Sequence, residues 1–152
     1  MLLAELLSAS ERVAGTRSRL AKIDALAQCL LRLDASEIAL GVAYLSGETR
    51  QGRVGIGYAA LKDALAATPA SAPRLALAQV DAALARLAQI KGEGSAGERA
   101  RLLAELFAGA TAAEQDFLAR LLLGELRQGA LQGIMLDAIA KAARLQIGRA
   151  HV

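Results

Sequence analysis

Two arginines, Arg50 and Arg127, have the clearest potential for chemistry, because each stands in the same short glycine-bounded pattern. Gly-Glu-x-Arg-Gln-Gly occupies residues 47–52 (the first corner) and returns 77 positions later at residues 124–129 (the second corner). Glycine permits a turn with positive φ and a close backbone approach to a ligand. An arginine offers a fork of donors that matches phosphate oxygens, and a helix that begins after the turn presents free N–H groups. The corners therefore predict contacts to two sugar-phosphate tracks.

The corners lie in register with a longer internal repeat. The same shift of 77 aligns two capping boxes, residues 34–37 and 111–114, and a third box is expected at 95–98. Each half of the chain reads as helix, capped helix, corner and helix. Two copies are too few for a solenoid, which needs about three, so we expect a pseudo-twofold pair of halves. The alternative that the residues leave open is that both corners are helix C-caps with solvated arginines.

A second basic cluster opens a predicted helix at residues 16–22. Thr16 is the expected N-cap, and Arg19 and Lys22 fall on one side of that helix because they are three positions apart. Arg17 and Ser18 complete the group. Phosphate contact is the functional interpretation of this cluster, and a solvated polar face is the alternative.

Other reactive residue types are scarce. Cys29 and His151 are the sole cysteine and histidine, which excludes an internal disulfide and an ordinary His/Cys zinc site. Cys29 is expected to be a buried thiol in a reducing, cytoplasmic setting. The glycines of residues 52–57 lack the preceding strand of a dinucleotide-binding fingerprint. Tyr44 and Tyr58 flank the first corner, with core packing as the first expectation and base stacking as the second.

Composition favours helices throughout. Alanine and leucine make up 64 of the 152 residues, and both are strong helix formers. Few β-branched or aromatic residues remain for strands, so the prediction is an all-α fold and a single helical domain built from two halves. The longest uncharged stretches, 38–47 and 64–73, have 10 residues, about half of the ~20 that a membrane span needs. The net charge of +3 does not by itself indicate nucleic-acid binding.

Apolar periodicity places the individual helices. Helices are expected at about 2–14, 17–33 and 58–67, and a proline-bearing linker at 68–73 separates the halves. The second helix is expected to bury its stripe Leu20, Ile23, Ala27, Leu30 and Leu33. The second half is expected to open with a helix whose buried seam is Leu77, Val80, Leu84 and Leu87.

Residues 45–57 and 114–133, with the cluster at 16–19, resemble the N-terminal DNA-binding domain of ATP-dependent DNA ligases, most of all the bacterial, actinobacterial-type enzymes. The resemblance covers about 1–145. It implies an all-helical, pseudo-symmetric, monomeric domain on the minor-groove side of nicked duplex DNA, with sequence-independent backbone contacts on both sides of the nick. Such ligases act in DNA repair, replication and recombination. By this resemblance the DNA-binding residues are Arg50, Gly52, Arg53, Arg127 and Gly129, followed by Thr16, Arg17, Ser18 and Arg19.

The resemblance also implies what the chain does not do alone. Ligases of this kind seal nicks with ATP and Mg²⁺ through a Lys-x-Asp-Gly motif in a separate catalytic domain, the expected partner of this one. Here the nearest match, residues 22–25, ends in Ala25. We therefore expect a ligase fragment that binds DNA without catalysis or cofactor. Residues 146–152 read like a translated sequencing adapter and are interpreted as a non-native tail. The competing hypothesis is a helical protein-interaction module with no role on nucleic acids.

Overall fold

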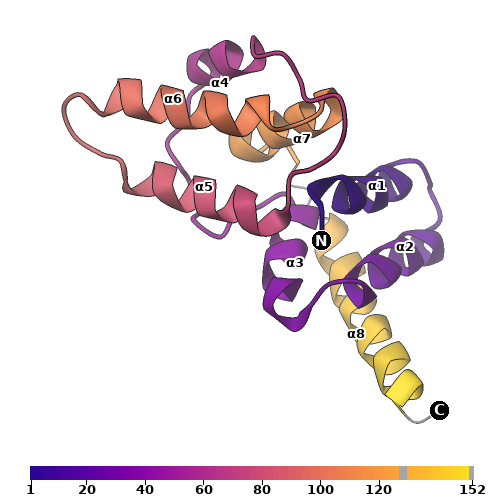
Figure 1. Cartoon of the computed structure of the whole chain (residues 1–152). Helices are drawn as coiled ribbons and strands as arrows, with labels where there is room; N and C mark the ends of the chain where they lie inside the picture. The colour runs from indigo at the N-terminus through magenta and orange to yellow at the C-terminus, as the bar shows by residue number, and fades with distance from the viewer. Residues whose placement is uncertain (127–129, 151–152) are drawn as a thin grey trace.

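The computed structural model describes residues 1–126 and 130–150, and within them the chain is all-α, as predicted (Figure 1). The described residues form eight α-helices and one 3-10 helix, with no strand. None of these helices is long and apolar enough to cross a membrane. In chain order the elements are α1 Leu3–Ala14, α2 Arg19–Leu31, η1 Ala35–Glu37, α3 Ile38–Leu45, α4 Tyr58–Leu65, α5 Leu77–Gln89, α6 Ser95–Ala108, α7 Ala112–Leu123 and α8 Ala130–Ala150.

The core follows the predicted apolar stripes with one exception. All four seam residues of α5, from Leu77 to Leu87, are fully buried. Ile23, Ala27 and Leu30 of α2 are buried as well, and so is Leu33, which lies two residues after that helix ends at Leu31. The prediction was wrong for Leu20, which is 78% exposed. This helix begins at Arg19 rather than Arg17, so Leu20 sits in its first turn, where no neighbouring element covers it.

The helices of the two halves correspond under the shift of 77 found in the sequence. Adding 77 to the bounds of α2 gives 96–108, and α6 spans Ser95–Ala108. Adding it to η1 and α3 together gives 112–122, and α7 spans Ala112–Leu123. The contacts between helices correspond too. The contact of α1 with α2 matches that of α5 with α6, and the contact of α1 with α7 matches that of α5 with α3. The contact of α2 with α8 matches that of α6 with α4. The last of these means that each half packs its fourth helix on the other half (Figure 1).

The capping boxes are found in two of the three predicted places. Thr111 caps α7 through its hydroxyl, which accepts from the Glu114 N–H at 3.3 Å, while the Glu114 carboxylate accepts from the Thr111 N–H at 2.8 Å. In the first half Glu37 accepts from the Asp34 N–H at 3.2 Å, the equivalent bond. The box at 95–98 was wrong: Gly94, with φ of +76°, leads into α6, so Ser95 already lies inside that helix.

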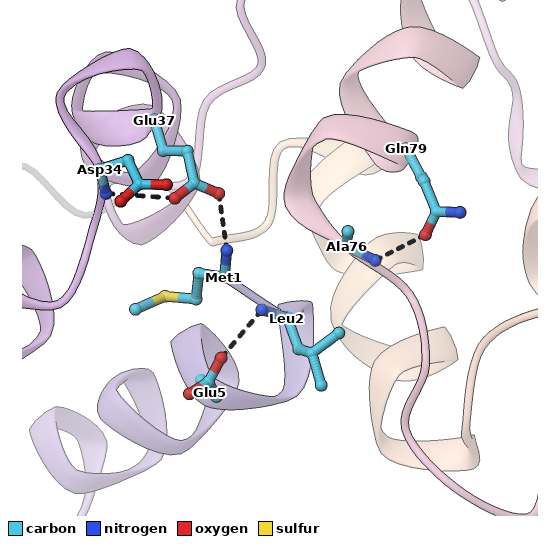
Figure 2. A network of polar contacts seen from close by, with 7 residues as sticks. All are labelled: Met1, Leu2, Glu5, Asp34, Glu37, Ala76 and Gln79. Atoms are coloured by element: carbon cyan, nitrogen blue, oxygen red, sulfur yellow. Dashed lines mark hydrogen bonds and ion pairs between the residues drawn. The ribbon is translucent and has the colours of Figure 1, made fainter.

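The amino terminus ties the two halves together (Figure 2). Leu2 and Ala76 form an isolated antiparallel bridge just before α1 and α5. Each N–H of this pair donates to the side chain three positions ahead, Leu2 to Glu5 at 2.9 Å and Ala76 to Gln79 at 2.8 Å. The starts of the two halves are held side by side by two backbone bonds, from the Leu3 N–H to the Leu75 carbonyl at 2.8 Å and from the Leu77 N–H to the Met1 carbonyl at 3.1 Å.

Glu37 joins the same network from the start of α3. Its Oε2 accepts from the Met1 amino group at 2.7 Å, while Oε1 accepts from Asp34 (Figure 2). The bond from Glu37 raises the pKa of the Met1 amino group above its usual value near 8.0. Reciprocally, the bond from the amino group lowers the pKa of Glu37 below 4.5. Both shifts mean that the charged pair is favoured in the folded chain.

We predict that Glu37→Gln lowers the free energy of unfolding at pH 7 by about 1 kcal/mol, the upper end for a partly exposed ion pair. In the unmodified chain, the lowered Glu37 pKa means that the stabilisation from the ion pair is lost as pH falls below about 5. The raised amino pKa means that the same stabilisation is lost as pH rises above about 8. Urea unfolding followed by circular dichroism at pH 4, 7 and 10 measures both limbs. The control is Glu105→Gln, which breaks an exposed pair with Arg101 at 3.2 Å. Equal effects of the two variants would contradict the prediction.

Candidate nucleic-acid interface

The first corner is a helix-ending turn built on a left-handed glycine. Gly47 follows α3 with φ of +80°. Its N–H donates to the Tyr44 carbonyl at 3.0 Å, and the next N–H, from Glu48, donates to the Ala43 carbonyl at 2.8 Å. This pair of bonds is the Schellman arrangement, which turns the chain sharply away from the helix axis.

The second corner begins with the same turn. Gly124 follows α7 with φ of +75°. Its N–H donates to the Leu121 carbonyl at 3.2 Å, and the Glu125 N–H donates to the Arg120 carbonyl at 2.9 Å. Each donor and acceptor is 77 positions from its counterpart in the first corner. Of the residues expected to bind DNA here, Arg127 and Gly129 lie outside the described residues.

The described parts of the two corners face each other across one hollow. Its volume is about 190 Å³, and its walls are Thr49, Gly52, Arg53 and Val54 on one side and 121–124 on the other. Two of the predicted contact residues, Gly52 and Arg53, are thereby brought beside the end of α7. The structure thus brings together two segments that are far apart in the sequence.

The first corner carries its two arginines in different surroundings. Arg53 is exposed. Arg50 is half-exposed, and its Nη1 lies 3.5 Å from Oδ2 of Asp81 on α5. The other oxygen of Asp81, Oδ1, accepts from Gln51 Nε2 at 2.8 Å. Asp81 is an acidic neighbour that the sequence analysis missed, and a phosphate at Arg50 would have to share or displace it.

The two tyrosines beside this corner have opposite environments. Tyr44 is fully buried in the core, as expected. Burial raises the pKa of its hydroxyl, and the charge of Asp81 adds to the increase while Arg50 opposes it. Tyr58 is 72% exposed, so the expectation of core packing was wrong for it. The reason is its place as the first residue of α4, where its side chain lies outside the contact between α4 and α6.

The basic cluster at 16–22 differs from its prediction. Ser18, not Thr16, caps the second helix: its hydroxyl accepts from the Ala21 N–H at 3.1 Å. Thr16 instead accepts from the Ser18 N–H at 3.2 Å, and Arg17 is exposed. Arg19 pairs with Asp137 of α8 at 2.5 Å, so it contributes to the contact between α2 and α8.

A larger hollow, of about 330 Å³, brings this cluster toward the second corner. Lys22 lines it together with Arg120 of α7 and Leu126, the last described residue before the gap. Arg120 also lies 3.4 Å from Asp116 within its own helix. The cluster and the second corner therefore share a surface, although no spacing in the sequence links them.

One functional candidate escaped the sequence analysis altogether. Arg99 of α6 donates to four backbone carbonyls, two of which belong to Val54 and Gly55 just after the first corner. No local pattern marks this arginine, because its partners lie 9 to 45 positions away. Among the described residues, no three histidine, cysteine, aspartate or glutamate side chains are grouped so as to hold a metal ion.

The sequence model of the DNA ligase N terminus family matches residues 59–140, more than half of the chain. The chain belongs to this family. The match begins after the first corner and includes the second, and it covers α5, α6 and α7 in full together with most of α4 and the first part of α8. The resemblance first seen at the corners is therefore confirmed.

Individual relatives extend the similarity to almost the whole of this chain. A probable DNA ligase of Anaeromyxobacter sp. (strain Fw109-5) is 55% identical over 149 residues, and one of Rhodococcus jostii (strain RHA1) is 50% identical over 147 residues. Both alignments cover 97% of this chain. A probable DNA ligase of Mycobacterium marinum (strain ATCC BAA-535 / M) is 50% identical over 148 residues and 95% of this chain. The chain spans 29% of the length of the first two relatives and 28% of the third.

We predict that Gly52→Ala lowers the free energy of unfolding by about 1 kcal/mol through backbone strain, since φ there favours glycine. Gly52 has φ of +68°, and a Cβ would meet no atom within 4 Å, so no clash contributes. The control is Gly97→Ala inside α6, where φ is not positive and the Cβ position is equally open, so alanine is not expected to destabilise the chain. Chemical unfolding of both variants checks this, and a loss at Gly97 as large as at Gly52 would refute the strain argument.

Proposed function

We propose that this domain binds nicked duplex DNA through the sugar-phosphate backbone, independently of base sequence, as the N-terminal part of an ATP-dependent DNA ligase. The observation that carries the proposal is the hollow between the loop of the first corner and the end of α7, where the second corner begins, with Arg53 on its wall. Two arginine-bearing corners with the same starting turn, one on each side of a hollow, suit a ligand that itself presents two similar backbone tracks. Double-stranded DNA is such a ligand.

The chemistry of the first corner supports phosphate as the group recognised. Arg53 offers an exposed guanidinium, and Gly52 leaves the space beside its backbone open. An arginine fork is a donor set that phosphate oxygens accept from in sequence-independent binding, and a glycine beside it lets the ligand approach the backbone closely. Arg50, held near Asp81, would add a second cation at the same corner.

The sealing reaction is proposed to reside in the part of the relatives that this chain does not span. That part would supply the nucleotidyltransferase lysine and, with ATP and Mg²⁺, the phosphoryl-transfer steps. In the whole enzyme this domain would hold nicked DNA against those catalytic domains during DNA repair, replication and recombination. The chain has no Lys-x-Asp-Gly motif, so we expect it to bind nicks without sealing them.

The exposed apolar side chains of α8 favour the competing hypothesis of a protein-interaction module. Leu136 is 65% exposed and Ile139 is 39% exposed, in positions that a partner helix could cover. A pure interaction module would show no affinity for DNA at low salt. DNA binding is therefore the measurement that separates the two functions.

We predict that the affinity for a nicked duplex falls steeply as salt rises, because phosphate contacts release counterions. Arg50→Ala, Arg53→Ala and Arg127→Ala are each expected to reduce the log–log salt slope by about one unit. Fluorescence anisotropy with a labelled nicked duplex, titrated at several salt concentrations, measures the slope. Arg101→Ala is the matched control, because this 62% exposed arginine of α6 pairs with Glu105.

Three results would contradict the proposal: no binding at low salt, a slope unchanged in all three corner variants, or an equal loss in Arg101→Ala. A shuffled duplex of the same length tests sequence independence and is expected to bind with the same affinity. Incubation of the bound complex with ATP and Mg²⁺ is expected to leave the nick open.

A further inference from the structure

Arg99 holds together the end of α5 and the loop after the first corner, two segments that lie far apart in the sequence. Its Nη1 donates to the carbonyls of Leu87 at 2.8 Å and Ile90 at 3.0 Å, at the end of α5. Its Nη2 donates to the carbonyls of Val54 at 2.6 Å and Gly55 at 3.1 Å, in the loop after the first corner. The guanidinium therefore caps the negative end of one helix and anchors the loop to it.

This anchor fixes the backbone on the far side of Arg53. On the near side, a compact turn is closed by the Gly52 N–H donating to the Thr49 carbonyl at 3.2 Å, and the Thr49 hydroxyl donating to the Gly52 carbonyl at 2.6 Å. On the far side, Val54 is buried and its carbonyl is held by Arg99. Arg53 thus has an exposed side chain on a backbone that is restrained before and after it.

We infer that Arg99 is a positioning residue that preorganises Arg53 for phosphate binding without touching the phosphate itself. The inference rests on the proposed DNA-binding function. Its physical basis is that a loop ordered before binding loses less conformational entropy when the ligand arrives. The half-buried guanidinium of Arg99 is already committed to four carbonyls, whereas Arg53 faces the hollow between the corners.

A lysine substitution at Arg99 distinguishes a role in positioning the loop from a role of the positive charge alone. Arg99→Lys keeps the positive charge at the site, but a single ammonium cannot reproduce a planar fork that reaches four carbonyls on two segments. If Arg99 acted through its charge, the lysine variant would bind DNA like the unmodified chain. If it acts through the fork, the lysine variant loses most of what Arg99→Ala loses.

The first arm of the test needs no DNA. We expect ¹⁵N order parameters of residues 54–57 to fall from about 0.85 to below about 0.6 in Arg99→Lys. The control is Arg101→Ala, two positions along the same helix, which is expected to leave them unchanged. Circular dichroism establishes that each variant is folded, and Arg99→Lys serves where Arg99→Ala is too unstable. Unchanged order parameters in a folded Arg99→Lys would overturn the inference.

The second arm measures nicked-duplex binding across salt concentrations. We expect Arg99→Lys to bind about tenfold more weakly at every salt concentration, with the salt slope of the unmodified chain. A slope lower by about one unit would make Arg99 a phosphate contact and overturn the positioning role. Unchanged affinity would overturn it as well. If the unmodified chain itself shows no salt-dependent binding, the proposed function fails while the order parameters still report on the anchor.

Discussion

The left-handed turn after α3 and α7 is the constraint on which the rest of this domain depends. A side chain at Gly47 or Gly124 would oppose the positive φ that closes the two backbone bonds of each turn. Without that turn the chain would leave each helix in another direction, and the loop after α3 would not reach the end of α7 across the hollow. The two glycines therefore have a structural role, because the position of the corner arginines depends on the turns that the glycines allow.

The turns also direct the packing of the halves. After the first corner the chain crosses to the other half, where α4 packs on α6. After the second corner α8 packs on α2 in the same way. The long helix α8 carries the larger of these two contacts and extends beyond the rest of the bundle (Figure 1). A rotation axis between the halves stays a prediction, whereas the corresponding bounds and pairings are observed.

The sequence predicts this fold well where the causes are local. The α5 seam is visible in the spacing of four apolar residues, and the corner turns are visible because only glycine suits their backbone. Local reasoning fails where two candidates lie close together: Thr16 and Ser18 both fit an N-cap, and the structure uses Ser18. It also fails for tertiary contacts. No spacing in the sequence indicates that Asp81 pairs with Arg50, or which carbonyls Arg99 contacts.

The exchange of fourth helices makes the two halves inseparable. A cut in the linker at 68–73 would leave α4 and α8 attached to halves on which they do not pack, with their apolar faces in water. The main packing partner of each last helix lies in the other half, so we expect the domain to fold as one cooperative unit despite its internal repeat. A single ancestral half could have satisfied the same geometry only by trading that helix with a second copy of itself.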